Sequence, residues 1–138
     1  MTNWISANWD APNSIIAGIT TRSAINFSFP VTGKPCWINQ IHGNSVIKAD
    51  HYNKQPEADA CISENSEYFC AVRTADCLPV LFCSSDGNSY AAAHAGWRGL
   101  AEGILENVVE SLLVDTSKII VWLGPAISQL SFEVGNDV

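Results

Sequence analysis

The stretch that decides the fold begins with Thr74-Ala75-Asp76-Cys77-Leu78-Pro79 and ends with His94-Ala95-Gly96-Trp97-Arg98-Gly99. Between these motifs lie a β-prone apolar run, Val80–Cys83, then a turn cluster, Ser84–Gly87, and then a second apolar run, Tyr90–Ala93. This order predicts a strand, a tight loop, a second strand and the start of a helix.

The register of this predicted hairpin brings two reactive side chains together. If Ser84–Gly87 forms the loop, Cys83 faces Asn88, and Cys77 lies opposite His94. Directly opposed residues of an antiparallel pair have Cβ atoms about 4.5–5.5 Å apart. A thiol and an imidazole at that distance can share a metal ion or a proton, and the spacing leaves both open.

Composition limits the classes of protein to consider. The chain has 138 residues, 47% of them hydrophobic and 15% charged, which predicts one globular domain with a sizeable core. Its net charge of −7 argues against nucleic-acid or membrane-surface partners. We see no secretory signal after Met1 and no apolar run of about 18 residues. Because the five cysteines include no CxxC motif, we expect a reduced, cytoplasmic protein.

The rest of the chain predicts a mixed α/β (α+β) layered structure. A helix is expected after His94, because apolar residues recur at three- and four-residue steps from Leu100 to Leu113. Short strands are expected over residues 14–20, 36–41, 46–47, 68–72 and 119–123, the last two of them buried.

Two of the three histidines, His42 and His94, precede glycine-containing turns at predicted strand ends, and Cys77 completes a His2Cys set. Three protein ligands leave the fourth position of a zinc tetrahedron open, and such a zinc lowers the pKa of bound water to about 7. A metal-free Cys–His nucleophilic pair fits the same hairpin. The same spacing is also compatible with hydrogen-bonded structural residues. Spacing alone does not choose among a metal site, a nucleophilic pair and a structural role. His51 lies in a polar loop and has no predicted role.

Further residues around the hairpin are candidates for binding a small anionic molecule. Trp97 and Arg98 lie at the expected helix start, where backbone N–H groups and a guanidinium suit phosphate. Surface pairing of Arg98 and core packing of Trp97 are the alternatives. Arg73 and Asp76 could orient a ligand or a metal-bound imidazole, or form a structural pair.

Five short motifs, in order, resemble the bacterial YfiH family, also called DUF152 or the multicopper polyphenol oxidase (laccase-domain) family. The resemblance covers roughly residues 15 to 138 and includes Ile19-Thr20-Thr21-Arg22 near the start. The five motifs are Asn39-Gln40-Ile41-His42-Gly43, Thr74–Val80, Ala93–Gly99, Gly124-Pro125-Ala126-Ile127 and Phe132-Glu133-Val134-Gly135.

The resemblance implies a mixed-sheet sandwich with flanking helices and a zinc site made by His42, Cys77 and His94, with copper as the alternative metal. It implies phosphorolysis of adenosine, inosine, guanosine and methylthioadenosine, and deamination of adenosine. For such an activity we expect, from the residues themselves, a catalytic set of Cys77, His94, His42 and Asp76. We expect phosphate and substrate to be bound by Arg98, Arg73, Trp97 and Gln40.

The sequence departs from the family pattern in two places. It is shorter between Arg22 and Trp37, and it stops after Gly135-Asn136-Asp137-Val138, where family members continue. We therefore expect a single domain over residues 1–138 that is incomplete at its C-terminal end. Three other hypotheses stay open: a copper-dependent polyphenol oxidase, a Cys–His hydrolase that edits peptidoglycan precursors, and an inactive remnant that self-associates through exposed apolar surface.

Overall fold

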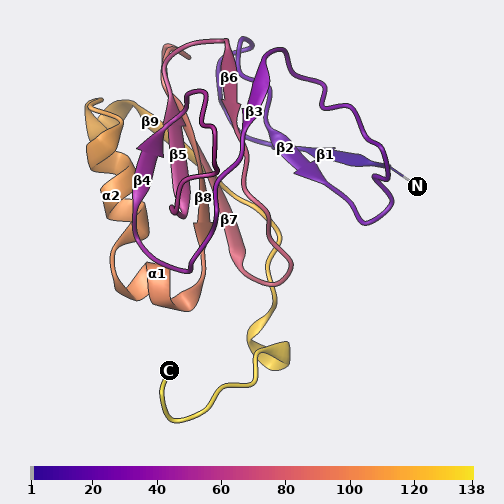
Figure 1. Ribbon diagram of the computed structural model, residues 1–138, viewed down its shortest axis with the longest axis vertical. Coiled ribbons are helices and arrows are strands. Elements are labelled where there is room, and N and C mark those ends of the chain that lie inside the picture. Colours follow the sequence, from indigo (N-terminus) through magenta and orange to yellow (C-terminus); the bar gives the residue numbers. More distant parts are fainter. Residues whose placement is uncertain (1) are drawn as a thin grey trace.

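A computed structural model describes residues 2–138 and shows a mixed α+β fold, which confirms the predicted fold class (Figure 1). The strands are β1 (Trp4–Ser6), β2 (Gly18–Thr20), β3 (Lys34–Cys36), β4 (Val46–Lys48), β5 (Ala60–Ser63), β6 (Tyr68–Cys70), β7 (Leu78–Ser84), β8 (Tyr90–Ala95) and β9 (Ile119–Leu123). The helices are α1 (Trp97–Ala101) and α2 (Ile104–Ser111), with short 3-10 turns at Thr116–Lys118 and Gln129–Ser131.

The main sheet has five strands in the order β4-β5-β8-β7-β9. The β7–β8 hairpin at its centre confirms the predicted pair of strands, but the predicted register is wrong by two residues, because Pro79 rather than Cys77 lies opposite His94. Ser84 and Ser89 close the loop, and Gly87 adopts a left-handed φ of +76° within it. The side chain of Asp86 accepts hydrogen bonds from the Ser84 hydroxyl and the Asn88 amide. These contacts keep Asn88 in the turn, so the strand pairing is shifted by two residues from the predicted register.

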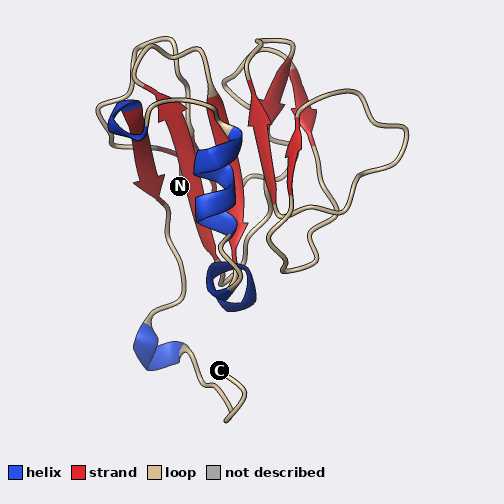
Figure 2. Cartoon of the chain, turned by 90° about the vertical axis from the view of Figure 1, so that its left-hand side faces the viewer, coloured by secondary structure: helices blue, strands red, loops and turns tan. Residues whose placement is uncertain are grey.

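One face of the sheet is covered by α2, which Figure 2 shows lying over the sheet and running roughly along its strands. The predicted single helix is wrong, because Gly103 takes a left-handed φ of +86° between α1 and α2 and breaks it. The predicted apolar stripe nevertheless forms the core. Ile104, Val108 and Leu112 pack on strand residues that include Val80 and Ala93, whereas Leu100 and Leu113 are exposed.

The opposite face of the sheet carries a second, smaller core. Strands β3 and β6 pair in parallel and lie on the other side of the sheet from α2 (Figure 1). The buried residues of this second core include Cys36, Ile38, Cys61 and Tyr68. Next to it, the β1–β2 pair and several aromatic rings border a cavity of about 680 Å³.

Two strand predictions need correction. The sequence predicts a strand over residues 36–41, but only Lys34–Cys36 pairs. The chain then passes through a single bridge at Asn39 into the irregular segment that holds His42. Ile119–Leu123 is a strand, but it is an edge strand rather than a buried one, with Leu123 61% exposed. Within residues 2–138, no helix combines the length and the apolar character that crossing a membrane requires.

Candidate metal centre

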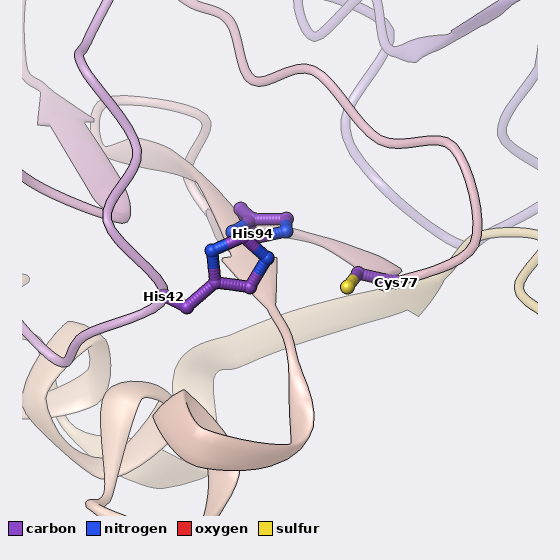
Figure 3. A group of neighbouring side chains, drawn as sticks. All are labelled: His42, Cys77 and His94. Atoms are coloured by element: carbon purple, nitrogen blue, oxygen red, sulfur yellow. The ribbon is translucent and has the colours of Figure 1, made fainter. Parts of the chain in front are cut away.

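His42, Cys77 and His94 come from three separate segments and face one common space (Figure 3). One ligand atom from each side chain lies within 4.8 Å of the others. The two imidazole rings are 4.8 Å apart between centroids and nearly perpendicular. The three side chains differ in exposure to solvent: His42 is exposed, Cys77 is half-buried and His94 is buried. The group is therefore anchored in the sheet and open to solvent on one side.

The backbone explains how these side chains meet despite the shifted hairpin register. His94 lies in β8 between Ala93 and Ala95, which pack toward α2, so its ring points to the opposite face of the sheet. Cys77 directly precedes β7, beside Gly96. A Cβ on Gly96 would lie 3.1 Å from Cδ2 of His42 and 3.4 Å from the Cys77 sulfur. Glycine at position 96 therefore leaves room for the side chains of His42 and Cys77.

His42 reaches the group through an unusual backbone conformation. Its φ is +60°, in the left-handed region that non-glycine residues rarely adopt. The side chain of Asp59 stabilises this conformation, because Oδ1 accepts a hydrogen bond from the His42 amide at 3.0 Å. Oδ2 accepts from the amides of Ile41 and Gly43 at 3.1 and 2.8 Å.

Asp59 also orients the second histidine. It is fully buried, and its Oδ1 lies 2.8 Å from Nδ1 of His94. Because the other three contacts of this carboxylate are backbone donors, the consistent assignment is that Nδ1 of His94 donates as well. In the neutral ring this hydrogen bond leaves the lone pair on Nε2, the nitrogen that would bind a metal ion.

Asp59 was missed in the sequence. Its signal there is a single charged residue enclosed by Ala58 and Ala60, in a segment that could be assigned to neither helix nor strand. A carboxylate surrounded by small apolar residues in a chain with few charges is a candidate for a buried, fully bonded role.

Burial, followed by the negative charges of Asp76 and Asp59, raises the pKa of the Cys77 thiol. The metal-free thiol is therefore mainly protonated at neutral pH. A bound cation would reverse this preference, because metal ligation requires the thiolate.

The remaining predicted site residues fall into two groups. Gln40 and Arg73 are joined, because the Gln40 side chain donates to the Arg73 carbonyl and accepts from its amide, each at 2.7 Å. The Arg73 guanidinium stacks over Trp37 at 4.0 Å. Gln40 thus ties the segment before His42 to the segment before Cys77.

The second group lies at the helix start. The Arg98 guanidinium stacks over the Trp97 ring at 4.4 Å, and its side chain is exposed. Because α1 has only five residues, an anion held here would depend mainly on the Arg98 side chain. Asp76 is exposed, and its carbonyl accepts from the Ile127 amide at 2.9 Å. His51 is exposed in its loop.

A family model described as multi-copper polyphenol oxidoreductase laccase matches residues 5–138. The chain belongs to this family. Its curated relatives include a Pseudomonas aeruginosa protein named purine nucleoside phosphorylase, 39% identical over 165 residues that cover 100% of this chain and 68% of the relative. Another is the purine nucleoside phosphorylase YfiH of Escherichia coli, 50% identical over 107 residues that cover 76% of this chain and 44% of the relative.

Solved structures of the YfiH family agree with this assignment. A Neisseria meningitidis protein of the DUF152 family is 36% identical, with a TM-score of 0.87 over 99% of this chain and 68% of that protein. YlmD from Geobacillus stearothermophilus is 27% identical, with a TM-score of 0.68 over 75% of this chain and 44% of YlmD.

The chain is shorter than these relatives in two respects. It spans about two thirds of the Pseudomonas protein and less than half of Escherichia coli YfiH. In addition, the Pseudomonas alignment extends over 165 residues for the 138 of this chain, so that relative carries internal residues that have no counterpart here.

Proposed function

We propose that this chain binds zinc through His42, Cys77 and His94 and acts in the phosphorolysis of purine nucleosides. The observation that supports the proposal best is the convergence of three ligand atoms within 4.8 Å, with His94 oriented by the buried Asp59. The names of the curated relatives supply the reaction class. The chain covers only part of the length of each relative, so the phosphorylase activity of the relatives is a proposal for this chain.

The donor set suits zinc. Two imidazoles and one thiolate are among its preferred ligands, and tetrahedral zinc holds such donors about 3.3–3.7 Å apart. The observed spread of up to 4.8 Å is wider by about an ångström, a difference of the size that changes in side-chain rotamer can supply. Three protein ligands leave one position for substrate or water, as in catalytic rather than structural zinc sites.

Copper fits less well. A blue-copper site uses two histidines and a cysteine but usually adds an axial methionine. The only methionine of the chain is Met1, which lies outside the described residues. With three histidines in the sequence, the chain is also short of ligands for several copper ions. We therefore propose zinc rather than the multicopper chemistry of the family description.

A bound zinc would act as a Lewis acid that polarises an oxygen of the substrate. The chain's own cations would hold phosphate, with Arg98 as the first candidate because its guanidinium is exposed beside Trp97. In phosphorolysis a phosphate oxygen bonds to C1′ of the ribose while the glycosidic bond to the purine nitrogen breaks. Asp76 is exposed beside Cys77 and is our candidate to exchange protons with the departing base.

The test combines metal analysis with product analysis. The purified chain and the variants Cys77→Ala and His42→Ala are assayed for bound zinc, then incubated with adenosine, inosine, guanosine or methylthioadenosine and phosphate. We expect stoichiometric zinc in the parent chain only, together with free base and ribose 1-phosphate. Inosine formed from adenosine would add the deaminase reaction to the proposal.

Two controls make this result decisive. His51→Ala removes a histidine from an exposed loop and should retain zinc and activity. Escherichia coli YfiH, assayed in parallel, shows that the conditions support turnover. Equal zinc in the parent chain and Cys77→Ala would refute the site, whereas zinc without any product would refute the activity of this chain alone.

A metal-free Cys–His hydrolase is the second candidate. The observation that favours it is the His94–Asp59 hydrogen bond, because a carboxylate also orients the histidine of nucleophilic triads. Iodoacetamide separates the two candidates. A zinc-bound Cys77 should be protected until a chelator is added, whereas a free nucleophile should react without one.

A further inference from the structure

Three cysteines that the proposed function does not use come together in the second core. Cys36 ends β3, Cys61 lies in β5 and Cys70 ends β6. The sulfur atoms of Cys61 and Cys70 are 3.2 Å apart. The thiol of Cys36 lies next to that of Cys61, and all three are free thiols. The contact between Cys61 and Cys70 therefore lies between β5 of the five-stranded sheet and β6 of the two-stranded β3–β6 sheet.

The two closest thiols differ in access. Cys61 is fully buried, whereas Cys70 is half-buried and lines the cavity of about 680 Å³. A small molecule that enters this cavity therefore meets residue 70, whereas Cys61 is fully enclosed and does not line the cavity. Bridging the two sulfur atoms requires an approach from 3.2 Å to about 2.05 Å, the length of a disulfide bond.

We propose that Cys61 and Cys70 form an oxidation site at which a hydroperoxide converts two thiols into a disulfide between β5 and β6. The Cys70 sulfur, as thiolate, attacks a peroxide oxygen and the O–O bond breaks. The leaving hydroxide takes up the thiol proton, giving water and a sulfenic acid. The Cys61 sulfur then attacks the Cys70 sulfur and the S–O bond breaks, releasing a second water molecule. Two thiols are oxidised by two electrons in total, and one peroxide is reduced to water.

The roles of attacking and resolving thiol follow from the surroundings of each sulfur. For Cys61, the hydrogen bond to Cys36 lowers the pKa, but the contact with Cys70 and burial outweigh it and raise the pKa. The contact with Cys61 and burial raise the pKa of Cys36. Both inner thiols therefore stay protonated and unreactive toward external oxidants, which leaves the cavity-lining Cys70 as the entry point.

The bridge would connect two segments that lead into the candidate metal centre. Cys61 follows Asp59 by two residues, and the chain from Cys70 passes through Arg73 to Cys77. The disulfide would thus hold these segments together without using a proposed metal ligand.

The test is oxidation of the full chain with a small excess of hydrogen peroxide, followed by acid quenching and thiol counting in denaturant with a chelator. We expect the count to fall from five thiols to three, and peptide mapping to find Cys61 linked to Cys70. Cys70→Ser should form no bridge involving Cys61. Because residue 70 is half-buried, this variant is expected to fold even if Cys61→Ser does not.

Two further variants serve as matched controls. Cys83→Ser removes a buried cysteine of β7, and Cys36→Ser removes the third member of the cluster, and both should still lose two thiols and keep the Cys61–Cys70 link. Five surviving thiols, a bridge between Cys36 and Cys61, or oxidation of Cys70 to a sulfinic acid with Cys61 still free would each overturn the proposal.

Discussion

Asp59 and His94 are both buried, and a carboxylate oxygen of the first lies 2.8 Å from Nδ1 of the second. The same carboxylate binds the backbone amides of residues 41–43. One side chain therefore positions two of the three proposed metal ligands, one by a direct hydrogen bond and the other by holding its backbone. Asp59 acts on the metal centre without being a ligand in it.

Asp59→Asn should weaken zinc binding by about 10- to 100-fold, the usual cost of losing the partner of a metal-bound histidine. The amide would place an NH2 group against backbone donors, so we also expect a loss of about 2 kcal/mol in the free energy of unfolding. Zinc affinity is measured by competition with a chromophoric chelator, and stability by urea unfolding of the metal-free protein.

The matched control for this change is Asp10→Asn, which alters an exposed carboxylate near the N-terminus. It should leave both quantities unchanged. If Asp59→Asn binds zinc as tightly as the parent chain, Asp59 is a structural residue only, and its proposed effect on His94 is wrong.

Gly96→Ala should lower zinc affinity with little effect on folding. The backbone of Gly96 has φ −74° and ψ 167°, which alanine adopts without strain, but the new Cβ would lie 3.1 Å from the His42 ring. Overpacking of this kind costs about 1–3 kcal/mol, and the exposed His42 side chain can relieve it only by moving. We expect a loss of about tenfold in zinc affinity and a nearly unchanged melting temperature.

Gly43→Ala is the control for Gly96→Ala, because residue 43 also adjoins His42, but its Cβ would meet nothing closer than 3.6 Å. It should bind zinc as the parent chain does. Equal losses in the two variants would show that affinity depends on the loop backbone rather than on the space beside His42.

The convergence of His42, Cys77 and His94 could be predicted because each stands in a short motif beside a turn, where strand ends leave side chains free to meet. The register of the hairpin was not predictable in the same way. The sequence contains a turn cluster, but the side chain of Asp86 and the left-handed Gly87 decide which residues close the loop. The role of Asp59 depends on a contact between chain segments 35 residues apart, which local patterns do not encode.

Gln40 is predicted to bind substrate, and in the structure its side-chain amide makes two hydrogen bonds of 2.7 Å to the backbone of Arg73. Gln40→Ala should therefore lower the free energy of unfolding by about 1 kcal/mol, since both bonds lie near solvent. Gln55→Ala, in an exposed loop, is the control and should have no effect on stability. A variant with unchanged urea unfolding but a raised KM for nucleoside would contradict this structural role and support the predicted substrate-binding role.

The fold should lose stability in alkaline solution through its buried thiols. Burial raises the pKa of Cys83 in β7, so this thiol ionises at a lower pH in the unfolded chain than in the folded one. Stability from such a group is complete below the unfolded pKa, about 8.5, and is lost as pH rises toward the folded value. In reductant, the urea midpoint of the metal-free chain should fall between pH 8 and pH 10. Cys83→Ala should start from a lower midpoint, because it leaves a small cavity, yet decline less steeply with pH. Parallel declines in the two proteins would show that Cys83 contributes nothing to the alkaline loss.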